Sequence, residues 1–243
     1  MERKSLVTIL AVIGGAIVLV IAAVVASKTT SNKKSVNASN LNMVSPINEM
    51  LRGIPQQGTA LGNPKAKLTL VEFADPQCSA CGTFSGGALP QVIATYVRTG
   101  RVRIEFEGQT FIDRQVSQDS KRLLRMALAA AKQNRFWNFI EIVYANQGTE
   151  DSGYATDAFL KAIANSIAGL DTNKAFAAAQ TSEFDPAIKA SAKRFENGHF
   201  GGTPSFLLGP TGKNQWVRIA PENITTFDDM KGQIDAELAK LRK

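Results

Sequence analysis

Residues 71–81 have the sequence VEFADPQCSAC and contain both cysteines of this 243-residue chain, Cys78 and Cys81. The residues that lead into them, Leu68 to Phe73, form a largely apolar run of strand length. An aspartate and a proline then end the expected strand, and residues 79–97 have a mostly helical pattern. The pattern therefore places both cysteines at a strand-to-helix junction, at the N-terminus of the helix.

The spacing of the two cysteines suits thiol–disulfide exchange. Three residues make about one helical turn, so both sulfurs lie on one face, at a Cα separation of roughly 5–5.5 Å that a disulfide accepts. Cys78 lies where unpaired backbone N–H groups and the helix dipole lower a thiol pKa, which makes it the expected nucleophile. Cys81, one turn deeper, is expected to be buried with a higher pKa and to resolve a mixed disulfide on Cys78.

The C-x-x-C spacing alone leaves three interpretations open. A zinc site needs about four ligands, whereas the rest of the chain offers no further cysteine and a single histidine, His199. A purely structural disulfide would close a loop too short to stabilise the fold much. The strand–turn–helix context favours the third interpretation, a redox-active pair.

Three separate pieces of the chain match one known pattern. They are FADPQCSAC at residues 73–81, GTPSF at residues 202–206, and a helical block between them that includes QNRFW at residues 133–137. In this order and at this separation they resemble the thioredoxin superfamily, specifically its DsbA-like (BdbD-like) branch of extracytoplasmic thiol:disulfide oxidoreductases. The resemblance covers about residues 61–241.

The resemblance implies an α/β fold of the thioredoxin-like type with an inserted helical block at about residues 115–197. In that branch the block usually shapes a groove beside the active site. The expected organisation is a signal-anchor transmembrane helix at 1–26, a flexible linker with a possible short docking helix at 27–60, and the DsbA-like domain at 61–243.

The resemblance also implies roles for particular residues. Glu72 matches the position of a buried acid that accepts the proton of Cys81, with an exposed-face side chain as the alternative that strand alternation allows. Pro204 matches the family's cis-proline, with an ordinary trans-proline turn as the alternative. The backbone of Thr203 would then pair with an extended substrate chain. The expected disulfide is Cys78–Cys81, with no cofactor and no metal.

Charge and composition exclude other function classes. The net charge of +7 comes from basic residues that are scattered along the chain, and no aromatic side chains interleave them as in a nucleic-acid groove. We therefore expect no nucleic-acid partner.

Residues 6–26 form an uncharged run that is long enough to span a bilayer, and an uncleaved anchor is favoured over cleavage after Val24-Val25-Ala26. Because stable disulfide chemistry needs an oxidising compartment, the domain is expected on the extracytoplasmic side of the cell membrane.

Other elements follow from local patterns. Apolar residues at helical spacing between Ile47 and Ile54 predict a short helix, and alternation over residues 101–106 predicts a strand beside the cysteine strand. The remaining expectations are a kink in the first long helix at Gly86-Gly87 or Pro90, a helix cap at Thr156, a helix start at Asp185-Pro186, paired strands at 205–208 and 215–219, and a closing helix at 224–241.

Three functions remain open on the sequence. The leading one is a membrane-anchored oxidase that donates disulfides to exported proteins and is reoxidised by a membrane quinone-linked partner. The second is a reductase or isomerase on the same fold, because the dipeptide Ser79-Ala80 lacks the proline and histidine of the strongest oxidants. The third is a non-catalytic partner-binding module with a structural disulfide.

Overall fold

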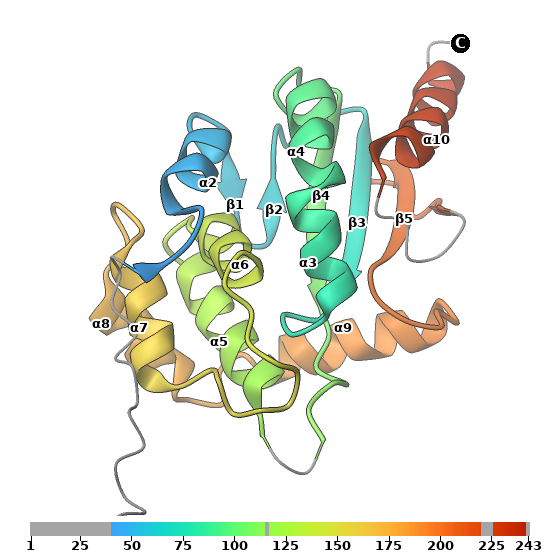
Figure 1. Ribbon diagram of the computed structural model, residues 1–243. Helices are drawn as coiled ribbons and strands as arrows, with labels where there is room; N and C mark the ends of the chain where they lie inside the picture. The colour runs from blue at the N-terminus through green and yellow to red at the C-terminus, as the bar shows by residue number, and fades with distance from the viewer. Residues whose placement is uncertain (1–39, 115–116, 220–225, 242–243) are drawn as a thin grey trace, which may run out of the picture. The chain divides into compact units, whose positions relative to one another are not determined.

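The structure, a computed structural model, describes residues 40–114, 117–219 and 226–241 (Figure 1). The expected anchor at 1–26 and the first part of the expected linker, residues 27–39, lie outside these ranges. Within the ranges described, no helix is both long enough and apolar enough to cross a membrane.

A mixed sheet forms the centre of the domain. Its strand order is β1-β2-β4-β3-β5-β6, with β3 parallel to β4 and antiparallel to β5. This confirms the predicted strand beside the cysteine strand. The strands are β1 (Gln56–Gln57), β2 (Ala60–Leu61), β3 (Leu68–Ala74), β4 (Val102–Gly108), β5 (Ser205–Pro210) and β6 (Val217–Arg218).

Helices cover the sheet and form the block between β4 and β5 (Figure 1). They are α2 (Val44–Leu51), α3 (Ser79–Gly86), α4 (Ala88–Val92), the π-helical η2 (Ile93–Val97), α5 (Asp119–Ala131), α6 (Phe136–Tyr144), α7 (Asp157–Asn165), α8 (Thr172–Ala179), α9 (Asp185–Asn197) and α10 (Phe227–Lys240). The predicted cap at Thr156 is confirmed, because its side chain accepts a hydrogen bond from the Phe159 N–H. The predicted start at Asp185-Pro186 is also confirmed.

Strand β3 is buried along its whole length, which is why its sequence is apolar rather than alternating. Leu68, Leu70 and Ala74 belong to the main core together with residues of α3, α4 and α6. Val71 and Phe73 point to the opposite face, where they pack with Phe200 in a second cluster. Because side chains alternate along a strand, Glu72 lies on the same face as the main core.

The first long helix breaks at Gly87, which confirms the expected kink and decides between its two candidate positions. Gly87 has φ −107° and ψ −80°, outside helical values, and its N–H still bonds to the Thr83 carbonyl at 3.0 Å. The break places Pro90 in the first turn of α4, where a missing N–H costs nothing. The chain then passes through η2 and leaves the helix at Gly100, whose φ of 69° favours glycine.

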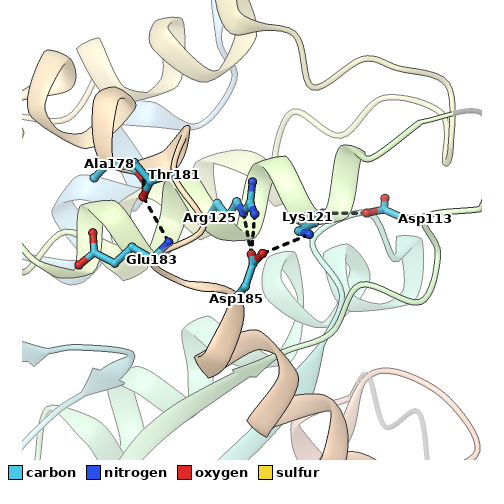
Figure 2. A network of polar contacts seen from close by, with 7 residues as sticks. All are labelled: Asp113, Lys121, Arg125, Ala178, Thr181, Glu183 and Asp185. Carbon is cyan, nitrogen blue, oxygen red and sulfur yellow. Dashed lines mark hydrogen bonds and ion pairs between the residues drawn. The ribbon is translucent and has the colours of Figure 1, made fainter.

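The start of α9 is fastened to α5 by ion pairs at the edge of the helical block (Figure 2). The carboxylate of Asp185 lies 2.6 Å from a guanidinium nitrogen of Arg125 and 3.5 Å from the Lys121 ammonium. The backbone N–H of Lys121 in turn donates to Asp113 at 2.9 Å. This network fixes the N-terminal turn of α5, which faces the active-site loop.

Two features differ from the sequence-based expectation. Strands β1 and β2 pair as a small antiparallel hairpin that residues 56–61 did not predict, because two-residue strands carry no detectable periodicity. The second strand of the predicted pair at 205–208 and 215–219 is shorter, consisting of Val217–Arg218 alone. The short helix α2 is confirmed, and it packs through the buried side chains of Ile47 and Leu51.

Candidate active site

Cys78 is the N-cap residue of α3 and faces the loop before β5. Its Sγ accepts a hydrogen bond from the Cys81 N–H at 3.4 Å and donates one to the Thr203 carbonyl at 3.3 Å. Its pKa is lowered from 9.0 to about 6, first by the hydrogen bond from the Cys81 side chain and then by those from Thr203 and the backbone, against the effect of burial. Cys78 is only 8% exposed, and its lowered pKa favours the thiolate at neutral pH.

Cys81 lies deeper and has the opposite electrostatics. It is fully buried. Burial is the main reason that its pKa is raised well above 9.0, and the hydrogen bond and negative charge of Cys78 add to the effect. Both cysteines are free thiols in the structure. The pair therefore combines an outer sulfur of lowered pKa with an inner sulfur of raised pKa, as the sequence predicts.

Glu72 is a buried acid below the cysteines. In the sheet it lies directly opposite Phe106 of β4 and Phe206 of β5, so two aromatic side chains flank it on the core face. Its Oε2 has no hydrogen-bond partner in the part of the chain that the structure describes. Burial, and after it the charge of Glu141, raise the pKa of Glu72 well above 4.5. The exposed-face alternative for Glu72 is therefore wrong, because helices cover β3 on both faces.

The loop before β5 closes the site from the other side. The Thr203–Pro204 peptide bond is cis, as predicted. Thr203 is 7% exposed, and its carbonyl is the group that contacts the Cys78 sulfur. His199 lies further back in the same loop in a left-handed conformation, with φ 51°. The structure thus brings Cys78, Cys81, Thr203 and Pro204 together.

A polar cluster that the sequence analysis missed fixes the turn before Cys78. Asp75 accepts hydrogen bonds from the Gln77 N–H at 2.9 Å, from the Ser120 hydroxyl at 2.5 Å and from the Ile112 N–H at 3.2 Å. Burial outweighs these bonds and raises the pKa of Asp75 to about 7. The Gln77 side chain also donates to Asp113 and Ser120. The turn is therefore anchored to the helical block through α5.

The loop after α6 covers the N-terminus of α3. The Gln147 side chain donates to the carbonyls of Pro76 at 2.9 Å and Cys78 at 3.0 Å. The Glu150 carboxylate accepts from the Ser79 N–H at 3.1 Å. A negative charge therefore occupies the helix end that also stabilises the Cys78 thiolate. No sequence motif indicated these contacts, because loop residues 147 and 150 approach the cysteines only through the tertiary fold.

A second buried acid, Glu141, also escaped the sequence analysis. All nine residues of α6 are buried, including Glu141. A signal was present in the sequence, because Glu141 is the one charged residue in the mostly apolar run FWNFIEIVY, and a buried carboxylate usually has a specific role.

The comparisons with known proteins agree with this geometry. A family model described as Thioredoxin matches residues 55–236. The chain is 28% identical over 196 residues to the probable disulfide bond formation protein D of Bacillus cereus, which covers 79% of this chain and 83% of the relative. It is 20% identical over 181 residues to disulfide bond formation protein D of Bacillus subtilis, with 73% and 76% covered.

Solved structures share the fold. BdbD from Bacillus subtilis in its oxidised form superposes with a TM-score of 0.63 at 20% identity, covering 76% of this chain and 98% of that one. The α-DsbA1 protein of Wolbachia pipientis superposes with a TM-score of 0.61 at 18% identity, covering 80% and 96%. The matched family model spans most of the domain, both sequence motifs and the inserted helices. The chain therefore belongs to the thioredoxin family, in its branch of DsbA-like thiol:disulfide oxidoreductases.

Proposed function

We propose that this protein introduces disulfides into exported proteins through its Cys78–Cys81 pair. The observation that carries the proposal is the opposite shift of two thiol pKa values one helical turn apart, with Cys78 lowered to about 6 and Cys81 raised. A stabilised thiolate in the reduced form makes the disulfide form a better oxidant. The names of the Bacillus relatives, which are disulfide bond formation proteins, agree with this direction.

The reaction follows from the positions of the two sulfurs. In the oxidised protein, a substrate thiolate attacks the Cys78 sulfur, the Cys78–Cys81 bond breaks, and Cys81 leaves as a thiolate that takes up a proton. A second substrate thiolate then attacks the substrate sulfur of the mixed disulfide. The substrate leaves with a new disulfide, and Cys78 is released as a thiolate. Two electrons pass from the substrate dithiol to the cysteine pair.

Glu72 and the cis-proline loop have supporting roles in this proposal. Glu72 is the buried group that exchanges a proton with Cys81, since the two groups interact electrostatically and burial raises the pKa of both. The Thr203 backbone, next to the Cys78 sulfur and the cis bond, is where an extended substrate segment pairs.

The cellular setting is also a proposal. The uncharged run at residues 6–26 supports a single-pass anchor in the cell membrane, with the catalytic domain on the extracytoplasmic side. Each catalytic cycle leaves the cysteine pair reduced, so a second oxidant must restore the disulfide. A membrane quinone-linked redox protein fits that requirement, because it accepts two electrons at the surface where the anchor would hold the domain.

A specific observation favours a reductase or isomerase as the second candidate. The Glu150 carboxylate accepts a hydrogen bond from the Ser79 N–H, and the Ser79 side chain is exposed. An anion at this helix end destabilises the neighbouring thiolate and makes the pair less oxidising.

The deciding experiment is the redox equilibrium of the purified full-length chain in detergent against graded glutathione buffers. We expect the pair to stay largely reduced until the buffer is strongly oxidising, and we expect the oxidised protein to form disulfides in a reduced, unfolded substrate. A Cys81→Ser variant should accumulate mixed disulfides on Cys78, whereas Cys78→Ser should not. A pair that stays oxidised in strongly reducing buffer would support the reductase, and a variant that traps no substrate would support the non-catalytic module.

A further inference from the structure

A cavity of about 350 Å³ lies beside the active-site helix. Its walls are mostly apolar and come from α2 and its N-cap, from α3 and α4, and from α6. Pro46, Ile47 and Met50 of α2 line one side, and Glu141 of α6 lies on the other. The cavity therefore reaches from the domain surface to a carboxyl group that is itself buried.

Glu141 connects this cavity with the cysteine helix. It is 2% exposed, and its Oε2 accepts a hydrogen bond of 2.5 Å from the Ser85 hydroxyl. Ser85 lies one turn after Cys81 on α3 and also lines the cavity. Burial raises the pKa of Glu141 to about 7, against the effect of the Ser85 hydrogen bond. Glu141 thus changes its protonation near neutral pH while in contact with the cavity.

Glu141 also interacts with Glu72. Trp137, one turn before Glu141 on α6, packs against Phe106, which pairs with Glu72 across β3 and β4. Tyr144, one turn after Glu141, donates a hydrogen bond to the Asp75 carbonyl just beyond the end of β3. Helix α6 therefore carries Glu141 along the face of the sheet on which Glu72 lies, and the charge of Glu141 raises the pKa of Glu72. The charge of Glu72 in turn raises the pKa of Cys81. Glu72 itself lines none of the cavity walls and has an unpartnered Oε2 in the region described. Glu72 therefore does not itself reach the cavity, whereas Glu141 does.

We propose that Glu141 carries protons between the buried Glu72–Cys81 pair and the cavity beside α2, which is their exchange route with solvent. The inference rests on the proposed function and deepens it. Glu141 acts through Glu72 and touches neither sulfur of the cysteine pair, so it is a positioning residue for the proton and not a catalytic one.

The proton balance is simple in each direction. When substrate thiolate breaks the Cys78–Cys81 bond, Cys81 leaves as a thiolate and takes the proton of the Glu72 carboxyl. Glu72 then takes the proton of Glu141, and Glu141 takes one from water in the cavity. When the pair is reoxidised, the Cys81 thiol returns one proton along the same route, so neither carboxyl changes over a full cycle.

The groups that face Glu141 are few. Ser85 comes from α3, Glu72 from β3, and Tyr144 lies one turn further along α6. Burial raises the pKa of Tyr144 well above 10.0, so it stays neutral at the pH of the reaction. The residues that α2 and α4 contribute to the cavity carry no charge: Pro46, Ile47, Met50 and Pro90. The pH dependence of the route therefore belongs to the two carboxyls.

The test is a single-turnover reaction of the oxidised full-length protein with a small dithiol, followed from pH 5.5 to 9. Glu141→Gln keeps the size of the side chain and an oxygen for Ser85 but cannot titrate. We expect its rate to fall about tenfold or more at pH 6. The ratio of wild-type to variant rates should decline as pH rises through about 7, because Glu141 itself is then ionised. Taking the ratio cancels the ionisation of the substrate thiol.

Two further variants separate proton transfer from structural support. Glu141→Ala enlarges the cavity, so added formate can enter it and should restore the reaction rate of this variant. Formate should not restore the rate of Glu72→Gln. Glu49→Gln, which removes an exposed carboxylate from α2, is the matched control and should react like wild type. If Glu141→Gln fails to fold, Gly86→Leu tests the route with both carboxyls in place, because a Cβ at Gly86 meets no atom within 4 Å and Gly86 lines the cavity.

Wild-type rates with a wild-type pH profile in folded Glu141→Gln would overturn the inference. If Gly86→Leu is tested instead, a wild-type rate in that variant would overturn it. These outcomes are distinct from failure of the proposed function. In that case the wild-type disulfide would not react with the dithiol at any pH, whatever residue stands at position 141.

Discussion

Cys78 owes its low pKa first to the side chain of Cys81 and only then to Thr203 and the backbone. The inner cysteine therefore has two effects on the outer one. It forms the disulfide, and in the reduced state it donates the hydrogen bond that holds the thiolate. The Ser79 side chain is exposed and is not among the groups that lower this pKa.

Replacing Cys81 with alanine should raise the pKa of Cys78 from about 6 toward its ordinary value of 9.0. The variant loses the strongest hydrogen bond to the thiolate and keeps the others. The measurement is the ultraviolet absorbance of the thiolate as a function of pH. Ser79→Ala is the control and should titrate like wild type. A Cys78 pKa that stays near 6 in Cys81→Ala would show that the backbone dominates.

Replacing Glu72 with glutamine should make the oxidised protein less sensitive to pH between 5 and 8. The unfolded chain releases the Glu72 proton near pH 4.5, whereas the folded chain holds it to a higher pH. Rising pH therefore favours unfolding of the wild type, and at pH 8 the variant should be more stable by about 1–3 kcal/mol. Urea unfolding at both pH values measures this. Equal losses of stability in both proteins would contradict a buried, protonated Glu72.

At the scale of elements, the N-terminus of α3 determines the redox balance. Its backbone N–H groups donate hydrogen bonds to two acidic groups, the Cys78 sulfur and the Glu150 carboxylate. The loop after α6 holds both the neutral Gln147 and the charged Glu150 against this end. The helical block therefore contributes directly to the chemistry of the cysteines as well as covering the sheet.

Glu150→Gln should lower the pKa of Cys78 and make the disulfide more oxidising. Removing an anion from a helix N-terminus is worth about 0.3–1 kcal/mol to a neighbouring anion, which corresponds to about 6–20 mV for two electrons. Glutathione equilibration of both proteins gives the shift, and Gln147→Glu should move the potential the other way. A potential that falls or does not change in Glu150→Gln would contradict the role of this charge.

At the scale of the whole domain, α2 is part of the packed body rather than of a flexible tether. Ile47 and Leu51 are buried, and the side chain of Gln56 accepts a hydrogen bond from the Trp137 N–H at 3.0 Å. A fragment that starts at Asn40 should therefore be more stable than one that starts at Gly58 by at least about 3 kcal/mol. Urea unfolding of the two fragments tests this, and equal midpoints would mean that α2 contributes nothing.

The sequence predicted the main strands and helices of the domain, without the β1–β2 hairpin, and four of the residues that meet at the site. Cys78, Cys81 and Pro204 could be predicted because the cysteine spacing and the proline loop are short local sequence patterns. The burial of Glu72 depends on cover from both faces of the sheet, which alternation along one strand cannot reveal. Glu141 and Glu150 reach the site through the packing of α6 and its following loop, so no local pattern could place them.

The contact between the Cys78 sulfur and the Thr203 carbonyl spans 125 residues of chain. The ribosome therefore makes both cysteines long before it makes the loop that faces them. A nascent chain that ends before residue 203 contains the sulfurs without the cis-proline loop and without a completed β5. The order of synthesis thus delays assembly of the reactive centre until nearly the whole domain exists.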